Sequence, residues 1–391
     1  MSSVIPFPDW KAKLLRGENG SLKKCMTNLM LHLRNLPGLG PEFRYNSLAC
    51  GVEWRGEPIR DEDYVEIRLV IESAGYVPDK ADVRAAVARL ALDNAFHPVQ
   101  QYLGGLQWDQ KPRLDRWLVA IFGTPETEYE TTIGPKWLIG AVARAFEPGC
   151  KMDNMLVLEG PQDIGKSTAL AALFGREYFT EMTLDLRDHK RFVEQILGKW
   201  VVEFAELATL RKSDTEMVKA VITMQIDRAQ RSYATHATEH PRQCVLAATV
   251  NPRQGSGYLS DPTGNRRFWP VRCSKVDMKL LLAARDQIWA EAVHRYRARE
   301  KWWLDQEAGA RANAESEKRV AVDPWQDILE QKLMVTSPYT SMEILKELGV
   351  QPDRQTQADK NRVASVMQLL GWEQKDAKDQ NRKTIRVWRH Q

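Results

Sequence analysis

The sequence predicts an α/β protein whose central part is a parallel sheet flanked by helices. Three observations support this fold class. A short apolar run at Met155–Leu158 is followed by a glycine-rich turn and then by a helical stretch that starts at Ala169. Further apolar runs alternate with helical stretches up to residue 273, as parallel α/β domains require. The regions 1–150 and 323–391 lack this alternation, so we expect separate domains there.

The strand candidates of the central region are short and apolar, as strands of a buried sheet are. Helical stretches from Asp214 to Thr223 and from Asp277 to Arg297 separate or follow them. The four strand candidates are Met155–Leu158, Trp200–Ala205, Cys244–Val250 and Phe268–Val271.

The turn after the first strand candidate has the pattern of a phosphate-binding loop, Gly-x-x-x-x-Gly-Lys-Ser. Its glycines allow backbone N–H groups to point at phosphate oxygens, and the helix that follows adds a positive dipole. Lys166 would reach the β- and γ-phosphates of ATP, and the Ser167 hydroxyl would hold Mg²⁺. The expected nucleotide-binding residues are Gly160, Pro161, Gln162, Asp163, Ile164, Gly165, Lys166, Ser167 and Thr168.

Composition limits the other possibilities. The chain of 391 residues suggests two or three domains, and its net charge is only +4, so any nucleic-acid surface must be local. Five scattered cysteines without a Cys-x-x-Cys pair favour reduced thiols over a disulfide framework or a zinc site. No run of about 18 apolar residues and no signal-peptide core is present, so we expect a cytoplasmic protein without a membrane segment.

Acidic residues end the second strand candidate, where a nucleotide hydrolase carries its metal-binding and water-activating carboxylates. Glu203 and Glu206 are the candidates: one would hold Mg²⁺ and the other would activate the attacking water. Their Glu-x-x-Glu spacing leaves open which does which. The alternative is a solvated pair at the edge of the sheet.

Polar residues at two further places complete the candidate catalytic set. Asn251 ends the third strand candidate and is positioned to orient the attacking water. Arg266 and Arg267 precede the fourth, and arginine suits the bidentate contact of an arginine finger with a γ-phosphate. If these arginines reach a neighbouring subunit's nucleotide, the active assembly is a ring. The alternative is that they form surface ion pairs.

The first 150 residues read as largely helical, with helices from Ser21 to Leu33, from Ala81 to Ala95 and from Trp137 to Phe146. The last stretch, 323–391, reads as two short helices, Ser341–Leu348 and Asp359–Leu370, followed by a hairpin, which predicts a winged helix. From Arg354 onward it holds nine Lys or Arg against four Asp or Glu. This excess favours contact with a phosphate backbone, and the alternative is a domain that only packs or oligomerises. The candidate DNA-contacting residues are Lys360, Arg362, Arg382 and Lys383.

Four segments carry a specific family resemblance. They are Phe96–Asp109, Pro148–Asp153, Glu159–Thr168 and Asp261–Pro270. Over about residues 80–390 the sequence resembles the virulence-associated protein E family of phages, prophages and mobile islands. That family's ATPase core is similar to the superfamily 3 helicases, a branch of the AAA+ ring ATPases.

The resemblance implies the roles already assigned to the phosphate loop, to Glu203 and Glu206, to the sensor Asn251 and to the two arginines. It adds Lys219 as a motif lysine. It also implies a channel-facing hairpin, in which Arg231 and His236 would contact phosphates and Tyr233 would stack on a base. The alternative for this hairpin is an ordinary surface loop. One departure is Asp163, where the family usually has Gly, and an acid there would repel phosphates unless it points outward.

The resemblance also implies a domain order. We expect a helical collar or connector at 1–150, an AAA+ core at 151–299, a charged linker at 300–322 and a winged helix at 323–391. The primase module often fused to such helicases is not visible, because 1–150 lacks a paired-carboxylate signature.

The expected function is that of an ATP-driven ring helicase or DNA translocase, in which a hexamer acts on single-stranded or forked DNA. A primase or another replication protein is the expected partner. One alternative is an initiator that ATP switches and that melts or marks an origin without processive unwinding. A second is an ATPase that remodels another protein, against which the basic C-terminal stretch argues.

Overall fold

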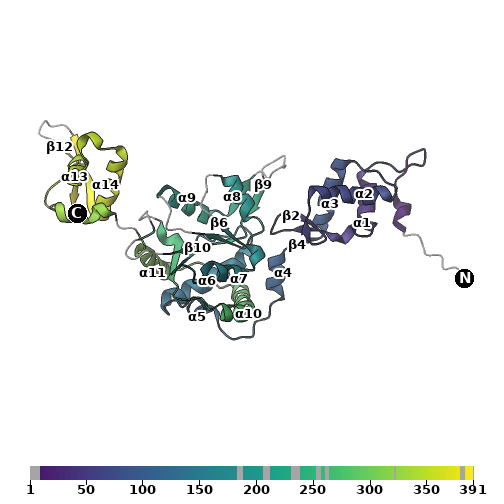
Figure 1. Cartoon of the computed structure of the whole chain (residues 1–391), viewed down its shortest axis with the longest axis horizontal. Helices are drawn as coiled ribbons and strands as arrows, with labels where there is room; N and C mark the ends of the chain where they lie inside the picture. The colour runs from purple at the N-terminus through teal and green to yellow at the C-terminus, as the bar shows by residue number, and fades with distance from the viewer. Residues whose placement is uncertain are drawn as a thin grey trace. The chain divides into compact units, whose positions relative to one another are not determined.

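The computed structural model describes residues 9–182, 188–205, 212–229, 238–251, 257–259, 264–320, 323–378 and 384–390. The chain forms two compact units (Figure 1). The first contains Met1–Pro252 and Pro262–Glu317, and the second contains Arg253–Asp261 and Lys318–Gln391. Across the described residues, no helix is both long enough and apolar enough to cross a membrane.

A five-stranded parallel sheet forms the centre of the first unit, as the sequence predicts. Its strand order is β11-β5-β10-β7-β6, so β5 lies between β11 and β10. The four predicted strands are confirmed. The edge strand β6 was not predicted because only two of its four residues are apolar and most of them are partly exposed. The strands are β5 (Met155–Glu159), β6 (Phe179–Met182), β7 (Val201–Phe204), β10 (Val245–Val250) and β11 (Phe268–Arg272).

Helices cover both faces of this sheet (Figure 1). The helices α5, α6, α7 and α10 lie on one side, and α8 and α9 lie on the other. A hairpin of β8 (Ile226–Ala229) and β9 (Thr238–Pro241) follows α9. The helices of this region are α4 (Pro98–Gly105), α5 (Trp117–Phe122), α6 (Glu128–Phe146), α7 (Lys166–Phe174), α8 (His189–Ile196), α9 (Lys212–Thr223) and α10 (Met278–Arg297).

Tryptophans fill the layer between the helices and the sheet. Trp200 and Trp289 pack with ring centroids 4.3 Å apart, and both contact Phe174. The indole N–H groups of these two tryptophans each donate to a backbone carbonyl: Trp200 to Ala141 at 2.8 Å and Trp289 to Leu173 at 2.8 Å. Burial of such large rings dominates core energetics when the polar N–H also finds a partner. This layer fixes α6, α7 and α10 against the sheet.

Two expected domain boundaries differ from the structure. The main core joins residues on both sides of position 150, from Leu48 to Ala312, because α6 packs directly on the sheet. The expected linker at 300–322 contains a helix, α11 (Gln306–Glu317), that packs on α6 and β11. Its buried face consists of Ala308, Ala312 and Ser316 at intervals of four residues. Small residues fit a close helix contact but leave no strong apolar signal in a charged sequence.

The N-terminal part of the first unit has its own core and a small sheet that the sequence did not predict. Its strand order is β3-β2-β1-β4, with β1 and β2 antiparallel and β1 and β4 parallel. Three helices complete this part, and the predicted helices at 21–33 and 81–95 correspond to α1 and α3. The elements are α1 (Met26–Asn35), β1 (Phe43–Asn46), β2 (Gly51–Trp54), β3 (Glu57–Pro58), α2 (Asp61–Ser73), α3 (Lys80–Asp93) and β4 (Ala95–Phe96).

Three helices and a hairpin form the C-terminal part of the second unit. Thr340 and Thr356 each begin a helix with a capping box, in which the hydroxyl accepts from the N–H of Glu343 or Asp359. Tyr339 exchanges two backbone hydrogen bonds with Trp388, which adds a third short extended segment to the hairpin. The elements are α12 (Pro324–Lys332), α13 (Ser341–Glu347), α14 (Gln357–Leu369), β12 (Trp372–Lys378) and β13 (Thr384–His390).

Candidate nucleotide site

The glycine-rich loop connects the carboxyl end of β5 to the N-terminus of α7, and its backbone explains its residues. Gly165 has φ 91° and Asp163 has φ 63°, both in the left-handed region that favours glycine. A Cβ atom on Gly160 would lie 2.5 Å from the backbone oxygen of Cys273. Glycine is therefore required at 160 by close approach of the chain after β11, and at 165 by conformation.

Lys166 is buried at the start of α7 and its ammonium lies inside the loop. Its Nζ donates to the backbone oxygens of Gly160 and Pro161 at 2.9 and 2.7 Å, and to Oδ1 of Asn251 at 2.9 Å. Burial lowers the pKa of the Lys166 ammonium. The structure thus brings the predicted lysine and the predicted sensor, Asn251, into direct contact across β5 and β10.

Glu203 lies at the carboxyl end of β7 and is fully buried. Its Oε1 accepts hydrogen bonds from the Ser167 hydroxyl at 2.7 Å and from the Thr249 hydroxyl at 2.6 Å. Its second oxygen, Oε2, is buried and has no hydrogen-bond partner among the residues that the structure describes. Burial raises the pKa of the Glu203 carboxyl, and the two hydroxyl donors partly offset that rise.

This arrangement fits a magnesium ion bound together with a nucleotide. Ser167 and Glu203 are hard oxygen donors placed next to each other at the phosphate loop, and Glu203 keeps one unpartnered buried oxygen. Mg²⁺ binds such sites through one or two protein oxygens and fills its remaining positions with water and phosphate oxygens. Across the described residues, no cluster of three or more His, Cys, Asp or Glu forms a separate metal site.

The other predicted loop residues differ in exposure. Ile164 is half-buried and packs against the main core, which anchors the loop. The remaining positions present backbone and side chains to solvent, where a ligand has access. The exposed loop residues are Pro161, Gln162, Asp163 and Thr168.

Thr249 is a site residue that the sequence analysis missed. It occupies the one half-buried position near the end of the otherwise buried strand β10, two residues before Asn251. A hydroxyl in an apolar strand next to the phosphate loop is a usable signal, because residues two apart in a strand share a face. The partner of this hydroxyl, Glu203, is distant in sequence and could not be read from the motif.

Arg266 and Arg267 lie at the amino end of β11, and the phosphate loop follows the carboxyl end of the neighbouring strand β5. They precede β11, and β11 pairs in parallel with β5 so that Phe268 is aligned with Met155. The loop follows the other end of β5, five residues later, which is about 16 Å along the strand. The arginines therefore lie at the end of the sheet that is remote from the phosphate loop of their own chain. Asn154 supports this turn by donating to the Arg266 carbonyl oxygen at 3.2 Å.

Lys219, the motif lysine implied by the resemblance, is buried on α9. Its Nζ lies 3.3 Å from Oε1 of Glu216. It also lies near the turn that carries the arginines, since a Cβ atom on Gly264 would be 3.8 Å from the Lys219 Nζ. Lys219 thus lies at the same end of the sheet as Arg266 and Arg267.

Several predicted residues lie outside the described part of the chain. They are Glu206, Arg231, Tyr233, His236, Arg382 and Lys383. The base of the predicted hairpin is described, and it is held by a buried ion pair between Arg242 and Asp227. In the second unit, Arg362 makes two hydrogen bonds to the Asp323 carboxylate and stacks on Trp325, so its charge has an internal partner. Lys360 is half-buried on the same helix.

One family model matches the sequence, and a solved structure resembles the fold. A solved apo structure of the NrS-1 C-terminal region is similar with a TM-score of 0.51 at 13% identity, and the match covers 88% of this chain and 95% of that one. Its A form gives a TM-score of 0.48 at 13% identity, with 89% and 96% covered. No curated protein matches. The family model of the virulence-associated protein E-like domain matches residues 103–321, more than half of the chain. The chain therefore belongs to the virulence-associated protein E-like family.

Proposed function

We propose that this protein is an ATP-hydrolysing ring helicase or DNA translocase that serves the replication of phage or mobile-element DNA. The single observation that carries the proposal is the network of Lys166, Ser167, Glu203 and Asn251 around the glycine-rich loop. Family membership supports the link to phages and mobile elements. We assign the parallel sheet and its helices to an AAA+ core on the same grounds.

In this proposal the residues of the chain have separate tasks. The loop N–H groups and Lys166 hold the phosphates of ATP, and Lys166 exchanges its bonds to loop carbonyls for bonds to phosphate oxygens. Ser167 and Glu203 hold Mg²⁺, which when bound neutralises charge on the phosphates. Because Glu203 accepts a hydrogen bond from Ser167, we propose that Glu203, and not Glu206, helps to hold Mg²⁺. Glu206 is then the proposed base, and Asn251 orients the water.

The arginine pair completes the site in trans. Since Arg266 and Arg267 lie about 16 Å along the strands from their own loop, we propose that they contact the nucleotide of a neighbouring subunit. A closed ring satisfies this requirement for every subunit at once. We propose a hexamer, which rests on the family resemblance.

We propose that the C-terminal part, with its three helices, hairpin and short segment at Tyr339, is a winged helix that contacts DNA. Lys360, Arg382 and Lys383 are the proposed contacts. Arg362 is a weaker candidate because Asp323 already pairs with it. We further propose a cytoplasmic setting and a primase or another replication protein as partner.

The first test is ATP hydrolysis by a Lys166→Ala variant. Loss of the ammonium removes charge stabilisation of the transferring phosphoryl group, so we expect turnover to fall by about a hundredfold or more. Lys190→Ala, on the exposed face of α8, is the matched control and should keep wild-type turnover. Undiminished hydrolysis by a folded Lys166→Ala protein would contradict the site assignment.

Two DNA assays separate helicase from the alternatives. ATP-dependent unwinding of a forked duplex is expected for the helicase, whereas an initiator would bind or melt DNA without sustained unwinding. ATPase activity that DNA does not stimulate would favour a protein-remodelling ATPase instead. Electron microscopy with an ATP analogue and forked DNA would report the ring size in the same preparation.

A further inference from the structure

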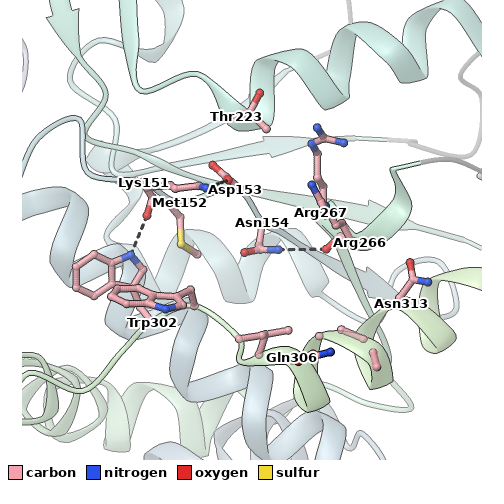
Figure 2. A pocket seen from close by; sticks show the side chains of 15 residues that line it. Lys151, Met152, Asp153, Asn154, Thr223, Arg266, Arg267, Trp302, Gln306 and Asn313 are labelled. Atoms are coloured by element: carbon pink, nitrogen blue, oxygen red, sulfur yellow. Dashed lines mark hydrogen bonds and ion pairs between the residues drawn. The ribbon is translucent and has the colours of Figure 1, made fainter.

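A cavity of about 970 Å³ opens in the first unit, at the end of the sheet where Arg266 and Arg267 lie (Figure 2). Its walls come from the segment before β5, the turn with the two arginines, the Trp302–Leu304 segment after α10, and helix α11. We call it the amino-edge pocket, because it lies at the amino ends of β5 and β11. The phosphate loop lies at the other ends of these strands, so the two sites are separate.

One wall of the amino-edge pocket is aromatic. The Trp302 indole N–H donates to the Lys151 backbone oxygen at 2.8 Å, which fixes that ring. Trp303 packs edge-on against it with centroids 5.1 Å apart and an interplanar angle of 84°. Half of the Trp303 residue surface, 50%, stays exposed. A large ring held rigidly by a neighbour and left half-open is suited to stack on a planar ligand.

The opposite wall is polar and positively charged (Figure 2). Arg266 and Arg267 line it, and the Arg267 guanidinium donates to the Gly264 backbone oxygen at 3.2 Å. Within the described residues, neither guanidinium forms an ion pair with a carboxylate. The one acid among the lining residues, Asp153, is already paired with Lys151 at 3.2 Å. The pocket therefore keeps an excess of positive charge that an anion would compensate.

Carboxamides lie between the two walls. Asn154 is held by its bond to the Arg266 carbonyl oxygen, and Gln306 and Asn313 come from α11 (Figure 2). Asparagine and glutamine side chains offer both a donor and an acceptor, which is what the edge of a nucleobase requires. The volume is in the range of pockets that enclose small organic ligands.

We propose that the amino-edge pocket binds a nucleotide unit, with its base stacked on Trp303 and its phosphate on the arginine pair. An aromatic platform, carboxamides and two guanidinium groups, neither of them ion-paired within the described residues, match the three parts of that ligand. The unit belongs either to a single strand or to a free nucleotide, and the two share this chemistry. The inference does not depend on the phosphate loop of the same chain, because Trp303, Gln306 and Asn313 take no part in that site. It shares only the arginine pair with the proposed function.

The test uses the full chain with Lys166→Ala, so that the phosphate-loop site does not dominate nucleotide binding. Binding of a fluorescein-labelled oligothymidylate is measured by fluorescence anisotropy, and binding of thymidine monophosphate by calorimetry. Adding Trp303→Ala should lower the affinity for one of these two ligands by about tenfold, because one base loses its stacking partner. Trp303→Phe keeps a stacking ring and should restore most of the affinity. The control Trp108→Ala removes a tryptophan that stacks on His294 outside the pocket and should change affinity less than about twofold.

The two ligands distinguish the source of the nucleotide. A Trp303-dependent loss with the oligonucleotide supports a single strand, and a loss with the mononucleotide supports a free nucleotide. If Trp303→Ala binds both ligands as tightly as the Trp108→Ala control, the proposal is wrong. Absence of ATPase activity in the wild-type protein would overturn the proposed function. It would not change the result of this binding assay, because all proteins in the assay carry Lys166→Ala.

Discussion

At the scale of single residues, Asp163 combines two costs in the phosphate loop. Its φ of 63° is unfavourable for a residue with a Cβ atom, although Asp tolerates it better than most. Its carboxylate is exposed on a loop that we propose receives phosphates. Both costs disappear with glycine, the residue that the resembled family usually has there. The sequence alone showed the charge, but only the backbone shows the strain.

We predict that Asp163→Gly binds ATP about two- to fivefold more tightly, the size of a partly screened charge effect. Asp163→Ala should gain the same affinity, because it also removes the charge. The two variants should differ in stability, since alanine at a positive φ costs about 1 kcal/mol relative to glycine. Calorimetric titration and thermal unfolding of the pair check this. Equal affinity of all three proteins would mean that the side chain points away from the phosphates.

Glu203 shows the conflict between function and stability. Its folded pKa lies above the ordinary carboxyl value because burial penalises the charge. The native state therefore holds the proton more strongly than the unfolded state does. Stability is greatest where Glu203 is protonated and falls as the pH rises from the unfolded pKa through the raised folded pKa.

We predict that Glu203→Gln lowers ATP turnover by about a hundredfold or more while raising the melting temperature. The increase in melting temperature should be largest at neutral pH. It should become smaller toward acid pH, where the wild-type carboxyl is itself neutral. Thermal unfolding across pH measures the difference. Glu57→Gln, exposed on strand β3 far from Glu203 in the sequence, is the control and should stay within about 0.5 kcal/mol of wild type. A melting temperature that falls at neutral pH would contradict the prediction.

At the scale of elements, helix α11 forms one wall of the amino-edge pocket and packs beside the turn that contains Arg266 and Arg267. The Ser316 hydroxyl donates to the Phe268 backbone oxygen at 2.7 Å, which ties the helix to the start of β11. Ala312 is buried in the main core, whereas Ala314 is exposed. The helix is thus part of the first unit and not a linker.

We predict that Ala308→Leu destabilises the protein by about 1–3 kcal/mol, because Ala308 lies on the buried face of α11, away from the pocket, and a larger side chain must displace its neighbours. Ala314→Leu makes the same change on the exposed face and should stay within about 0.5 kcal/mol. Denaturant unfolding of the two variants provides the comparison. Equal stability would mean that α11 is not packed as described.

Elements with a local signal could be predicted from the sequence, and those that depend on distant contacts could not. The phosphate loop and its strand were predictable because a fixed motif and an apolar run define them. The contact of Thr249 with Glu203 joins strands 46 residues apart, so no local pattern reports it. The strands β1 and β2 have four residues each with mixed exposure, which is too short for a clear period of two. Helix α11 was missed because its buried face is made of small residues.

At the scale of the whole molecule, the parallel sheet separates the two halves of the proposed catalytic site. The phosphate loop follows the carboxyl end of β5, and the arginines precede the amino end of β11, the strand next to it. One chain therefore cannot bring its own arginines to its own nucleotide without losing the sheet. This geometry favours catalysis between subunits, and it leads to a prediction about mixtures.

We predict that Arg266→Ala or Arg267→Ala loses most ATP turnover, as does Lys166→Ala, and that mixing the two kinds of variant restores part of it. In a mixed ring, some interfaces pair the intact loop of one subunit with the intact arginines of its neighbour, so these interfaces hydrolyse ATP. Turnover is measured after co-assembly, with subunit mixing verified by two affinity tags. A Lys166→Ala protein mixed with a Lys166→Ala, Arg266→Ala double variant is the control, because every loop in that mixture is defective and no activity should return. If verified mixed rings of the single variants stay as inactive as this control, the arginines do not act on a neighbouring nucleotide.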